Sequence, residues 1–383
     1  MTVNRPNFSF AALKQRIVEQ APQLGIDKIG FTTADPFQEL KNQLEQHRKL
    51  GRESGFEEPD LDKRVDPQLS FPHGKARSII AIAVAYPSKL PHPPKSEPGA
   101  YRGIISRSAW GADYHHVLRE RMERLTQWVR AEVPDCRIED MVDTGALVDR
   151  AVAMRAGIGW YGKNCAVITP EFGSWVFLGE MITDIPFPPD TPVLDDCGDC
   201  SLCIDACPTG ALVGPGELDA TRCVSFITQT KGFIDDAMKR KIGNRLYGCD
   251  TCQVVCPKNK GLNWTHHAEL QPDPEQVKPL LSPLLTMTNR EFRVRFGNSA
   301  AAWRGRKPIQ RNAIIAIGHF RDASAVPQLI ELMRDERPVI RGTAAWALGR
   351  IGGEEAAKAI EAACAVEIDE QAKAEMRRAM VGL

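Results

Sequence analysis

The chain has 383 residues, too many for one ordinary hydrophobic core, so we expect two or three domains. Its hydrophobic (43%) and charged (26%) fractions are typical of soluble globular proteins, and a formal net charge of zero excludes attraction to nucleic acid or membrane by the overall charge. No stretch approaches 18 uninterrupted apolar residues, and the start shows neither an apolar leader nor a twin-arginine pair. We therefore expect a cytoplasmic protein without membrane contact. We also expect a monomer.

The first 180 residues mix helical and strand patterns. Residues 1–20 have the pattern of an amphipathic helix, and 76–87 form an apolar run bounded by proline that predicts a buried strand. Residues 114–133 place apolar side chains on one helical face. Residues 175–182 predict a further strand, which a proline-rich linker follows.

Eight of the eleven cysteines lie between residues 197 and 256. The first four follow C-x2-C-x2-C-x3-C-P, the ferredoxin run in which the fourth cysteine binds a second cluster. The second set ends in C-x2-C-x3-C-P. Reciprocal exchange predicts two [4Fe–4S] clusters, the first held by Cys197, Cys200, Cys203 and Cys256, and the second by Cys207, Cys223, Cys249 and Cys252.

Other interpretations of the cysteines fit less well. A structural zinc site pairs two short hooks across a spacer, whereas three cysteines at two-residue intervals crowd one metal. Disulfides are not expected in a leaderless chain of this kind. Cys136, Cys165 and Cys364 fall outside the pattern and are expected to be buried or inert.

From about residue 280 the chain is predicted to be helical, with an internal repeat. The segment 308–318 recurs 31 residues later as 339–349, which aligns Gly318 with Gly349, and a weaker third copy begins near Gln371. Repeats of this kind resemble HEAT-like arrays. Two clear copies cannot bury a core alone, so we expect them to dock on the rest of the protein.

A basic segment precedes and enters this repeat. Such a run is usually a solvated face, but the aromatic residues between the charges favour contact with phosphates. The basic side chains are Arg290, Arg293, Arg295, Arg304, Arg306, Lys307 and Arg311.

In order, the motifs "VDTG" (142–145), "RAGIGWYGKN" (155–164) and "ITPEFGSWVFLGEMITD" (168–184), both cysteine motifs and the helical tail resemble epoxyqueuosine reductases. The resemblance covers essentially the full length. One departure is Ala146, where many relatives carry proline, which changes a turn rather than a chemical group.

The resemblance implies an α+β fold in three parts. These are a nitroreductase-like, cobalamin-binding catalytic domain (1–185), a ferredoxin-like domain with two [4Fe–4S] clusters (186–265), and a HEAT-like repeat domain that contacts tRNA (266–383). It also implies the reaction, reduction of epoxyqueuosine to queuosine and water at the wobble position of tRNA. Cob(I)alamin would act on the epoxide, the clusters would regenerate it, and an external low-potential donor would supply electrons.

The oxygen of an opening epoxide needs a proton, so a general acid is expected. The resemblance gives this role to Asp143, whose pKa must then be raised by burial or by contact with substrate and cofactor. The structural alternative is that Asp143 caps a helix beginning near Gly145.

The glycine-rich segment 157–164 would bring backbone close to a corrin ring, although a tight structural turn is the plainer interpretation. The D-x-H-x-x-G signature of a cobalt-binding histidine is incomplete at His115, so His115 and His116 are expected to start a helix. The expected cofactor-binding residues are Arg64, Ser106, Arg107, Trp160, Lys163, Asn164, Val167 and Ser225.

Two rival functions stay open. A reductive dehalogenase would share cobalamin and two clusters, but usually carries a twin-arginine leader. A non-catalytic electron-transfer or cobalamin-binding protein would retain its cofactors and show no turnover to lose when Asp143 is replaced by alanine.

Overall fold

The computed structural model describes residues 9–381, and their contacts divide into two compact units. Each unit combines three separate stretches of chain: 9–88, 112–221 and 251–271 in the first, and 89–111, 222–250 and 272–381 in the second. The mixed α+β class is confirmed. The domain borders expected at residues 185 and 265 stay a prediction.

The first unit is built on a four-stranded antiparallel sheet. Its order is β1 (Lys28–Thr33), β2 (Ser78–Ala85), β7 (Val176–Thr183) and β4 (Ile138–Met141). Every residue of β2 is buried, because helices cover both faces of the sheet. The two strands expected near 76–87 and 175–182 are confirmed as β2 and β7.

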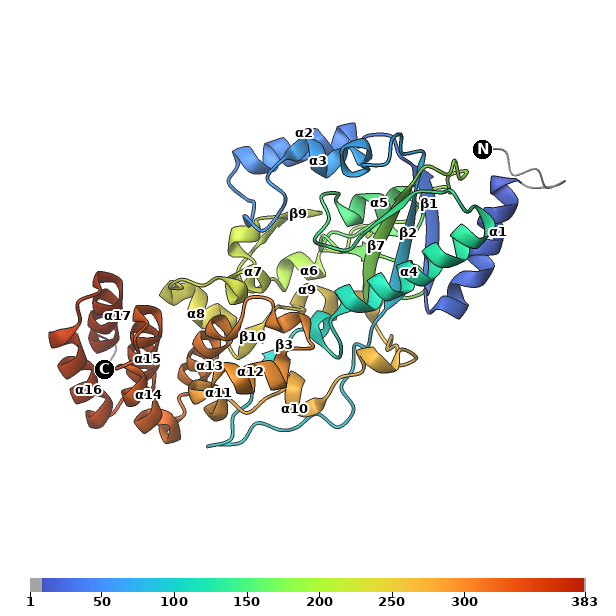
Figure 1. Cartoon of the computed structure of the whole chain (residues 1–383). Coiled ribbons are helices and arrows are strands. Elements are labelled where there is room, and N and C mark those ends of the chain that lie inside the picture. The colour runs from blue at the N-terminus through green and yellow to red at the C-terminus, as the bar shows by residue number, and fades with distance from the viewer. Residues whose placement is uncertain (1–8, 382–383) are drawn as a thin grey trace. The chain divides into compact units, whose positions relative to one another are not determined.

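Three helices cover this sheet (Figure 1). α1 (Phe10–Gln20) and α4 (Tyr114–Glu132) pack on one face, and α5 (Asp149–Arg155) packs on the other. The apolar stripe expected along 114–133 faces the core in α4, and the Asp113 carboxylate caps its first turn. Residues 1–8 of the expected N-terminal helix lie outside the described residues.

Shorter elements complete the first unit. The polar helix α2 (Gln38–Lys49) and α3 (Leu61–Val65) follow β1. The segment 157–168 folds as a two-stranded hairpin, and the cysteine region contributes short helices and a second hairpin. These elements are β5 (Trp160–Tyr161), β6 (Val167–Ile168), α6 (Leu202–Asp205), β8 (Leu212–Gly214), β9 (Glu217–Leu218) and α9 (Thr251–Val254).

The second unit is mainly helical (Figure 1). Strands β3 (Ile104–Ile105) and β10 (Arg245–Tyr247) form a short parallel pair within it. Its helices outside the repeat discussed next are α7 (Val224–Gln229), α8 (Asp236–Ile242), α10 (Pro274–Val277), α11 (Ser282–Thr286), α12 (Asn289–Phe296), α14 (Val326–Leu332) and α16 (Glu354–Val366).

The predicted repeat corresponds to α13 (Arg306–Phe320), α15 (Pro338–Ile351) and α17 (Glu370–Val381). The repeated glycines lie where each helix meets the next. A Cβ on Gly318 would come within 2.7 Å of the Trp346 ring, and one on Gly349 within 2.7 Å of the Ala379 carbonyl oxygen. The glycines therefore permit close packing between successive repeats.

Buried polar side chains at the start of α13 fix the segment around β10. Asn312 is fully buried, and its amide donates to the carbonyls of Thr228 (2.7 Å) and Leu246 (2.8 Å). Arg311 is 1% exposed, and its guanidinium donates to the carbonyls of Ile227 and Gly232. The expectation that Arg311 contacts tRNA is therefore wrong, because its guanidinium is buried and hydrogen-bonded to carbonyls within the unit.

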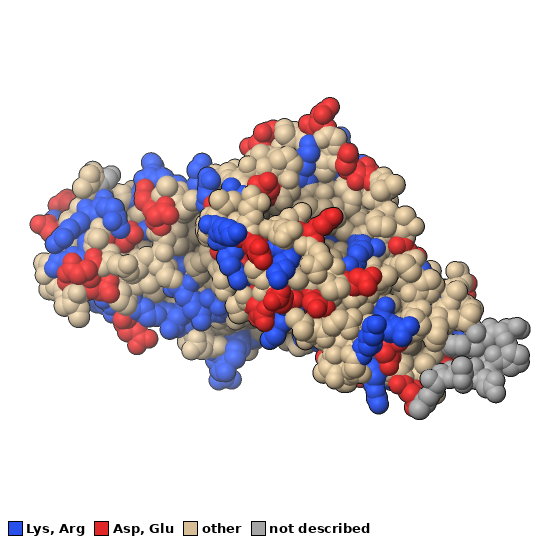
Figure 2. All heavy atoms as spheres, turned by 90° about the horizontal axis from the view of Figure 1, so that it is seen from above, with Lys and Arg blue, Asp and Glu red and all other residues tan. Residues whose placement is uncertain are grey.

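Charge is mixed over the molecular surface. The face in Figure 2 shows Lys and Arg beside Asp and Glu, as the zero net charge leads one to expect. Among residues 9–381, no helix combines the length and apolarity needed to cross a membrane.

Replacing Asn312 with leucine should destabilise the protein by about 1–3 kcal/mol for each carbonyl left unpaired. The Leu246 carbonyl would lose its donor without gaining water, whereas the Thr228 carbonyl would keep the Arg311 guanidinium at 3.5 Å. Thermal unfolding followed by circular dichroism measures this loss, with exposed Lys307→Leu on the same helix as the control. Equal melting temperatures for the two variants would contradict the account.

Candidate active site and iron–sulfur sites

Four cysteines of the first unit surround one small cavity. It has a volume of about 40 Å³ and is lined by the four thiols that the spacing assigns to cluster one, Cys197, Cys200, Cys203 and Cys256. The short helices α6 and α9 bring the two halves of the motif together. Lys163, Asn164 and Lys258 also line this cavity. The structure thus brings three cysteines of the first motif together with Cys256, more than 50 residues later in the chain, which is the combination that reciprocal ligation requires.

The other four cysteines are divided between the units. In the first unit, Cys207 and Cys252 belong to one apolar cluster with Cys165 and Tyr161, and the Cys207 sulfur accepts the Ala211 N–H at 3.2 Å. In the second, Cys223 precedes α7, and Cys249 follows β10. Cys136, Cys165 and Cys364 are buried, as expected.

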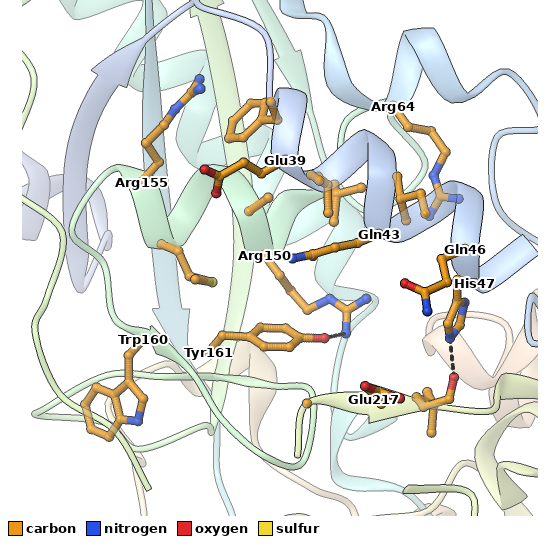
Figure 3. Close-up of a pocket in the computed structure, with 18 of the residues that line it drawn as sticks. Glu39, Gln43, Gln46, His47, Arg64, Arg150, Arg155, Trp160, Tyr161 and Glu217 are labelled. Carbon is orange, nitrogen blue, oxygen red and sulfur yellow. Dashed lines mark hydrogen bonds between the residues drawn. The ribbon is translucent and has the colours of Figure 1, made fainter. Parts of the chain in front are cut away.

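A much larger cavity, of about 1260 Å³, lies in the first unit. Figure 3 shows its walls: α2 supplies Gln43 and His47 from one side, and α5 and the β5–β6 hairpin supply Arg150 and Tyr161 from the other. Arg64 also lines it, and burial lowers the pKa of this guanidinium. The volume exceeds the roughly 300–1,000 Å³ of pockets for drug-sized ligands.

Sequence reasoning placed Arg64 and Trp160 at a cofactor site, and both line this cavity, but it missed α2 and Arg150. α2 has no buried side chain, because its inner face borders the cavity instead of the core. α2 is mostly polar, and its two leucines, Leu40 and Leu44, lie one turn apart and border the cavity. A helix with so narrow an apolar face is itself a signal of such a position. Arg150 donates to the Cys165 carbonyl at 2.6 Å and lies 3.4 Å from the Tyr161 hydroxyl, contacts that only the fold creates.

The β5–β6 hairpin separates the two cavities. Trp160 and Tyr161 border the large one, whereas Lys163 and Asn164 border the cysteine cavity. The Lys163 ammonium donates to the Gly198 carbonyl in the first cysteine turn, and Lys258 lies 4.9 Å from the centre of the Trp160 ring. Lys163 and Asn164 thus lie beside the cysteine cavity, and their contact with a corrin stays a prediction.

Three more of the expected cofactor-binding residues lie in the second unit, and one is in the core. Ser106 donates to one carboxylate oxygen of Asp250 at 2.5 Å, and Arg107 to the other at 2.9 Å, next to Cys249. The Ser225 carbonyl accepts hydrogen bonds within α7. The Val167 side chain is 3% exposed within the hydrophobic core, so only its backbone could face a cofactor.

Asp143 lies on the loop between β4 and α5, in the left-handed region at φ +50°. Its carboxylate accepts the Tyr114 hydroxyl at 2.7 Å and lies 3.7 Å from the Nε2 atom of His115. Helix α5 begins only at Asp149, so Asp143 does not cap a helix at Gly145, and that alternative is excluded. His115 and His116 occupy the first turn of α4, as expected.

The contacts set the charges of this group. The His115 imidazole, 3.7 Å away, holds the pKa of Asp143 below its usual range, so this pKa is not raised as the sequence argument required. Burial alone would lower the pKa of His115, but its hydrogen bond to Asp113 and the nearby Asp143 carboxylate raise it to about 9. At neutral pH the proton therefore resides on the imidazole, beside an ionised Asp143.

The expected nucleic-acid residues differ in exposure. Arg290, Arg293 and Lys307 are exposed on α12 and α13. The other three outside the core are half-buried and donate to backbone carbonyls: Arg295 to Glu275, Arg304 to Gln229, and Arg306 to Met287.

The α+β unit with its cysteine-lined cavity, joined to helical repeats, defines an iron–sulfur protein. Family models match three stretches: Epoxyqueuosine reductase QueG, DUF1730 over residues 64–144, a 4Fe-4S double cluster binding domain over 196–259, and HEAT repeats over 300–380. The two-cluster and HEAT-like expectations are thereby confirmed.

Relatives match nearly the whole chain. An epoxyqueuosine reductase of Bacillus subtilis is 58% identical over 96% of this chain and 95% of its own. A solved epoxyqueuosine reductase with an epoxyqueuosine-modified tRNA-Tyr stem loop is 56% identical (TM-score 0.95), covering 98% of this chain and 100% of its own. A B. subtilis structure with its catalytic aspartate loop swung out of the active site matches equally well (TM-score 0.95, 56% identity, 98% and 100% coverage). This chain belongs to the epoxyqueuosine reductase family.

The His115–Asp143 ion pair predicts a pH dependence. Because the pKa of His115 is raised from 6.5 to about 9, the imidazole and the Asp143 carboxylate are both charged at neutral pH, and the pair is lost as the pH rises through about 9. Turnover should fall over that range, and His115→Gln should remove this limb of the pH profile. His116→Gln, at an exposed neighbouring position, is the control. A wild-type profile in His115→Gln would refute the assignment.

Proposed function

We propose that this chain reduces epoxyqueuosine to queuosine in tRNA, using electrons from two [4Fe–4S] clusters and cobalamin, and a proton delivered through Asp143. Membership of the family supports the reaction, and the relative bound to a modified tRNA stem loop supports the substrate. Removing the epoxide oxygen as water consumes two electrons and two protons. The clusters would accept the electrons from an external low-potential donor.

The observation that carries the proposal is the Asp143 carboxylate, which is held by Tyr114 and faces the protonated His115. An alkoxide is a poor leaving group, so a donor must protonate the oxygen as the carbon–oxygen bond breaks. Negative charge developing there raises the affinity of Asp143 for a proton. His115 can resupply that proton across 3.7 Å, and Asp113 holds the imidazole in place through Nδ1 at 2.7 Å.

The swung-out aspartate loop of the B. subtilis relative supports a mobile donor. We take the loop carrying Asp143 as its counterpart. Its side-chain hydrogen bonds within the first unit are few: Tyr114 to Asp143, Arg119 to Thr144 at 3.2 Å, and the Asp143 N–H to Asp149 at 3.0 Å. Such a loop can open for a large substrate and close again without breaking a hydrophobic core.

The large cavity fits cobalamin in size, and its walls combine apolar side chains with both cationic and acidic ones. Trp160 offers a flat apolar surface, and its buried Nε1 has no partner among residues 9–381. Arg64 and Arg150 would face phosphate or amide groups. When bound, cobalamin supplies a strongly reducing and nucleophilic cobalt for attack on the epoxide.

We further propose ligands for both clusters. Cys197, Cys200, Cys203 and Cys256 would hold cluster one, which their shared cavity supports. Cys207, Cys223, Cys249 and Cys252 would hold cluster two, which the sequence pattern and the matched double-cluster domain support. Exposed Arg290, Arg293 and Lys307 would bind tRNA phosphates, and binding should therefore weaken with salt.

Asp143→Asn should lower the single-turnover rate on epoxyqueuosine tRNA by about 100-fold or more, because an amide donates no proton to the leaving oxygen. Iron content and the cobalamin spectrum should be unchanged. Asp140→Asn, an exposed carboxylate on neighbouring β4, should behave as wild type. The proposal fails if Asp143→Asn keeps the wild-type rate.

Arg64→Gln should weaken cobalamin binding by about tenfold, since about 1.4 kcal/mol of charged contact is lost. Titration of the visible spectrum measures the affinity, and iron analysis should show both clusters intact. Arg16→Gln removes an exposed arginine of the same unit as a control. Unchanged cobalamin affinity in Arg64→Gln would show that the cavity holds something else.

A further inference from the structure

A carboxyl group is buried in the sheet beneath the Asp143 loop. Glu180 of β7 is 1% exposed, and no N–H or hydroxyl group of residues 9–381 hydrogen-bonds to either carboxyl oxygen. It pairs in register with Ala81 of β2 and Met141 of β4, neither of which titrates. Burying an ionised carboxylate in this position would cost folding free energy, so a neutral, protonated Glu180 or a specific partner is required.

The partner of Glu180 is a second carboxyl. Asp149, the first residue of α5, packs over β7 and interacts with the Glu180 side chain. Two carboxyl groups can hydrogen-bond to one another only when one of them carries a proton. A hydrogen bond within the Asp149–Glu180 pair would therefore require one shared proton, as in other close carboxyl pairs.

Asp149 connects this pair to the loop. Its Oδ2 atom accepts the backbone N–H of Asp143 at 3.0 Å. Asp143 is held at φ +50°, a conformation that costs free energy for a residue with a side chain and persists only when neighbouring contacts enforce it. The Asp149 carboxylate is the contact that fixes the Asp143 backbone.

The charges around the pair favour the protonated form. Burial raises the pKa of Glu180 well above its ordinary value, and the negative charge of Asp149 raises it further. Burial and the charge of Asp143 raise the pKa of Asp149 to about 6. Two cations act on the neighbouring carboxylates: Arg150, whose guanidinium is hydrogen-bonded to the Cys165 carbonyl, acts on Asp149 and Asp143, and the protonated His115 acts on Asp143.

We propose that Glu180 is a positioning residue for Asp143: it donates its proton to Asp149 and so orients Asp149 to hold the Asp143 N–H. This inference rests on the proposed role of Asp143 as proton donor. Loss of the shared proton leaves like charges side by side on Asp149 and Glu180 and releases the constraint on the loop. The loop position thereby depends on protonation of a group that the substrate does not touch.

If Glu180 had a purely structural role, Glu180→Leu would lower the melting temperature. We expect the opposite: because burying a carboxyl without an N–H partner is unfavourable, Glu180→Leu should leave the melting temperature unchanged or raise it. A positioning role predicts that the same variant loses turnover. Glu180→Gln keeps a donor toward Asp149 and carries no charge, so it should restore turnover at neutral pH.

The experiment uses the anaerobic holoenzyme and four proteins: wild type, Glu180→Leu, Glu180→Gln, and the control Glu139→Gln, which neutralises a half-buried carboxylate on β4. Infrared difference spectra should show a protonated-carboxyl band at neutral pH in wild type and control, and its loss in both Glu180 variants. Single-turnover rates should fall about tenfold in Glu180→Leu and stay within about twofold of wild type in Glu180→Gln. At alkaline pH, Glu180→Gln should exceed wild type.

The inference is overturned if the infrared band is absent from wild type, or if Glu180→Leu shows the wild-type rate and pH profile. Should Glu180→Leu fail to fold, the infrared spectrum and pH profile of Glu180→Gln still decide the question. A fully active Asp143→Asn enzyme would instead remove the proposed function. An inactive Asp143→Asn enzyme beside a Glu180→Gln profile that overlays wild type would remove only this inference.

Discussion

The pairing of β2 with β7 is the constraint on which the first unit depends. Eight consecutive residues of each strand pair in one antiparallel register, from Ser78 with Thr183 to Ala85 with Val176. A shift by one residue would send Glu180 to the opposite face, among the apolar side chains under α4. The register therefore decides both where the core is apolar and where the buried carboxyl meets α5.

The cysteine region obeys a different constraint. Between residues 197 and 256 the elements are short, and few large apolar side chains are buried. The first unit nevertheless brings the four thiols of one predicted cluster around a single cavity. Metal–thiolate bonds can supply folding free energy that such a segment lacks from hydrophobic burial.

Features that repeat or obey a spacing rule could be predicted from the sequence. The two strands, α4, the repeated glycines and the grouping of four cysteines all follow from local patterns. The burial of Arg311 could not be predicted, because its partners are carbonyls about 80 residues away. The low pKa of Asp143, which lies on a loop, likewise depends on His115, which lies on α4 and is distant in the sequence.

Glu180 and α2 show a subtler limit. Glu180 is visible in the sequence as an acid within an apolar strand. Its partner Asp149, however, lies 31 residues earlier in the chain, on a helix that packs across the sheet. α2 is visible as a mostly polar helix with two leucines one turn apart, but only the folded chain places it along the large cavity. In both cases the sequence shows a segment that departs from the usual pattern of its element, and only the tertiary contacts explain the departure.

The β5–β6 hairpin has a consequence for how the family can vary. Its residues Trp160 and Tyr161 wall one cavity, while Lys163 and Asn164 wall the other, so one layer of polypeptide serves both. A change that reshapes this layer alters both chambers at once. A substitution that moves the hairpin therefore couples the two linings, whereas a substitution in α2 changes the large cavity alone.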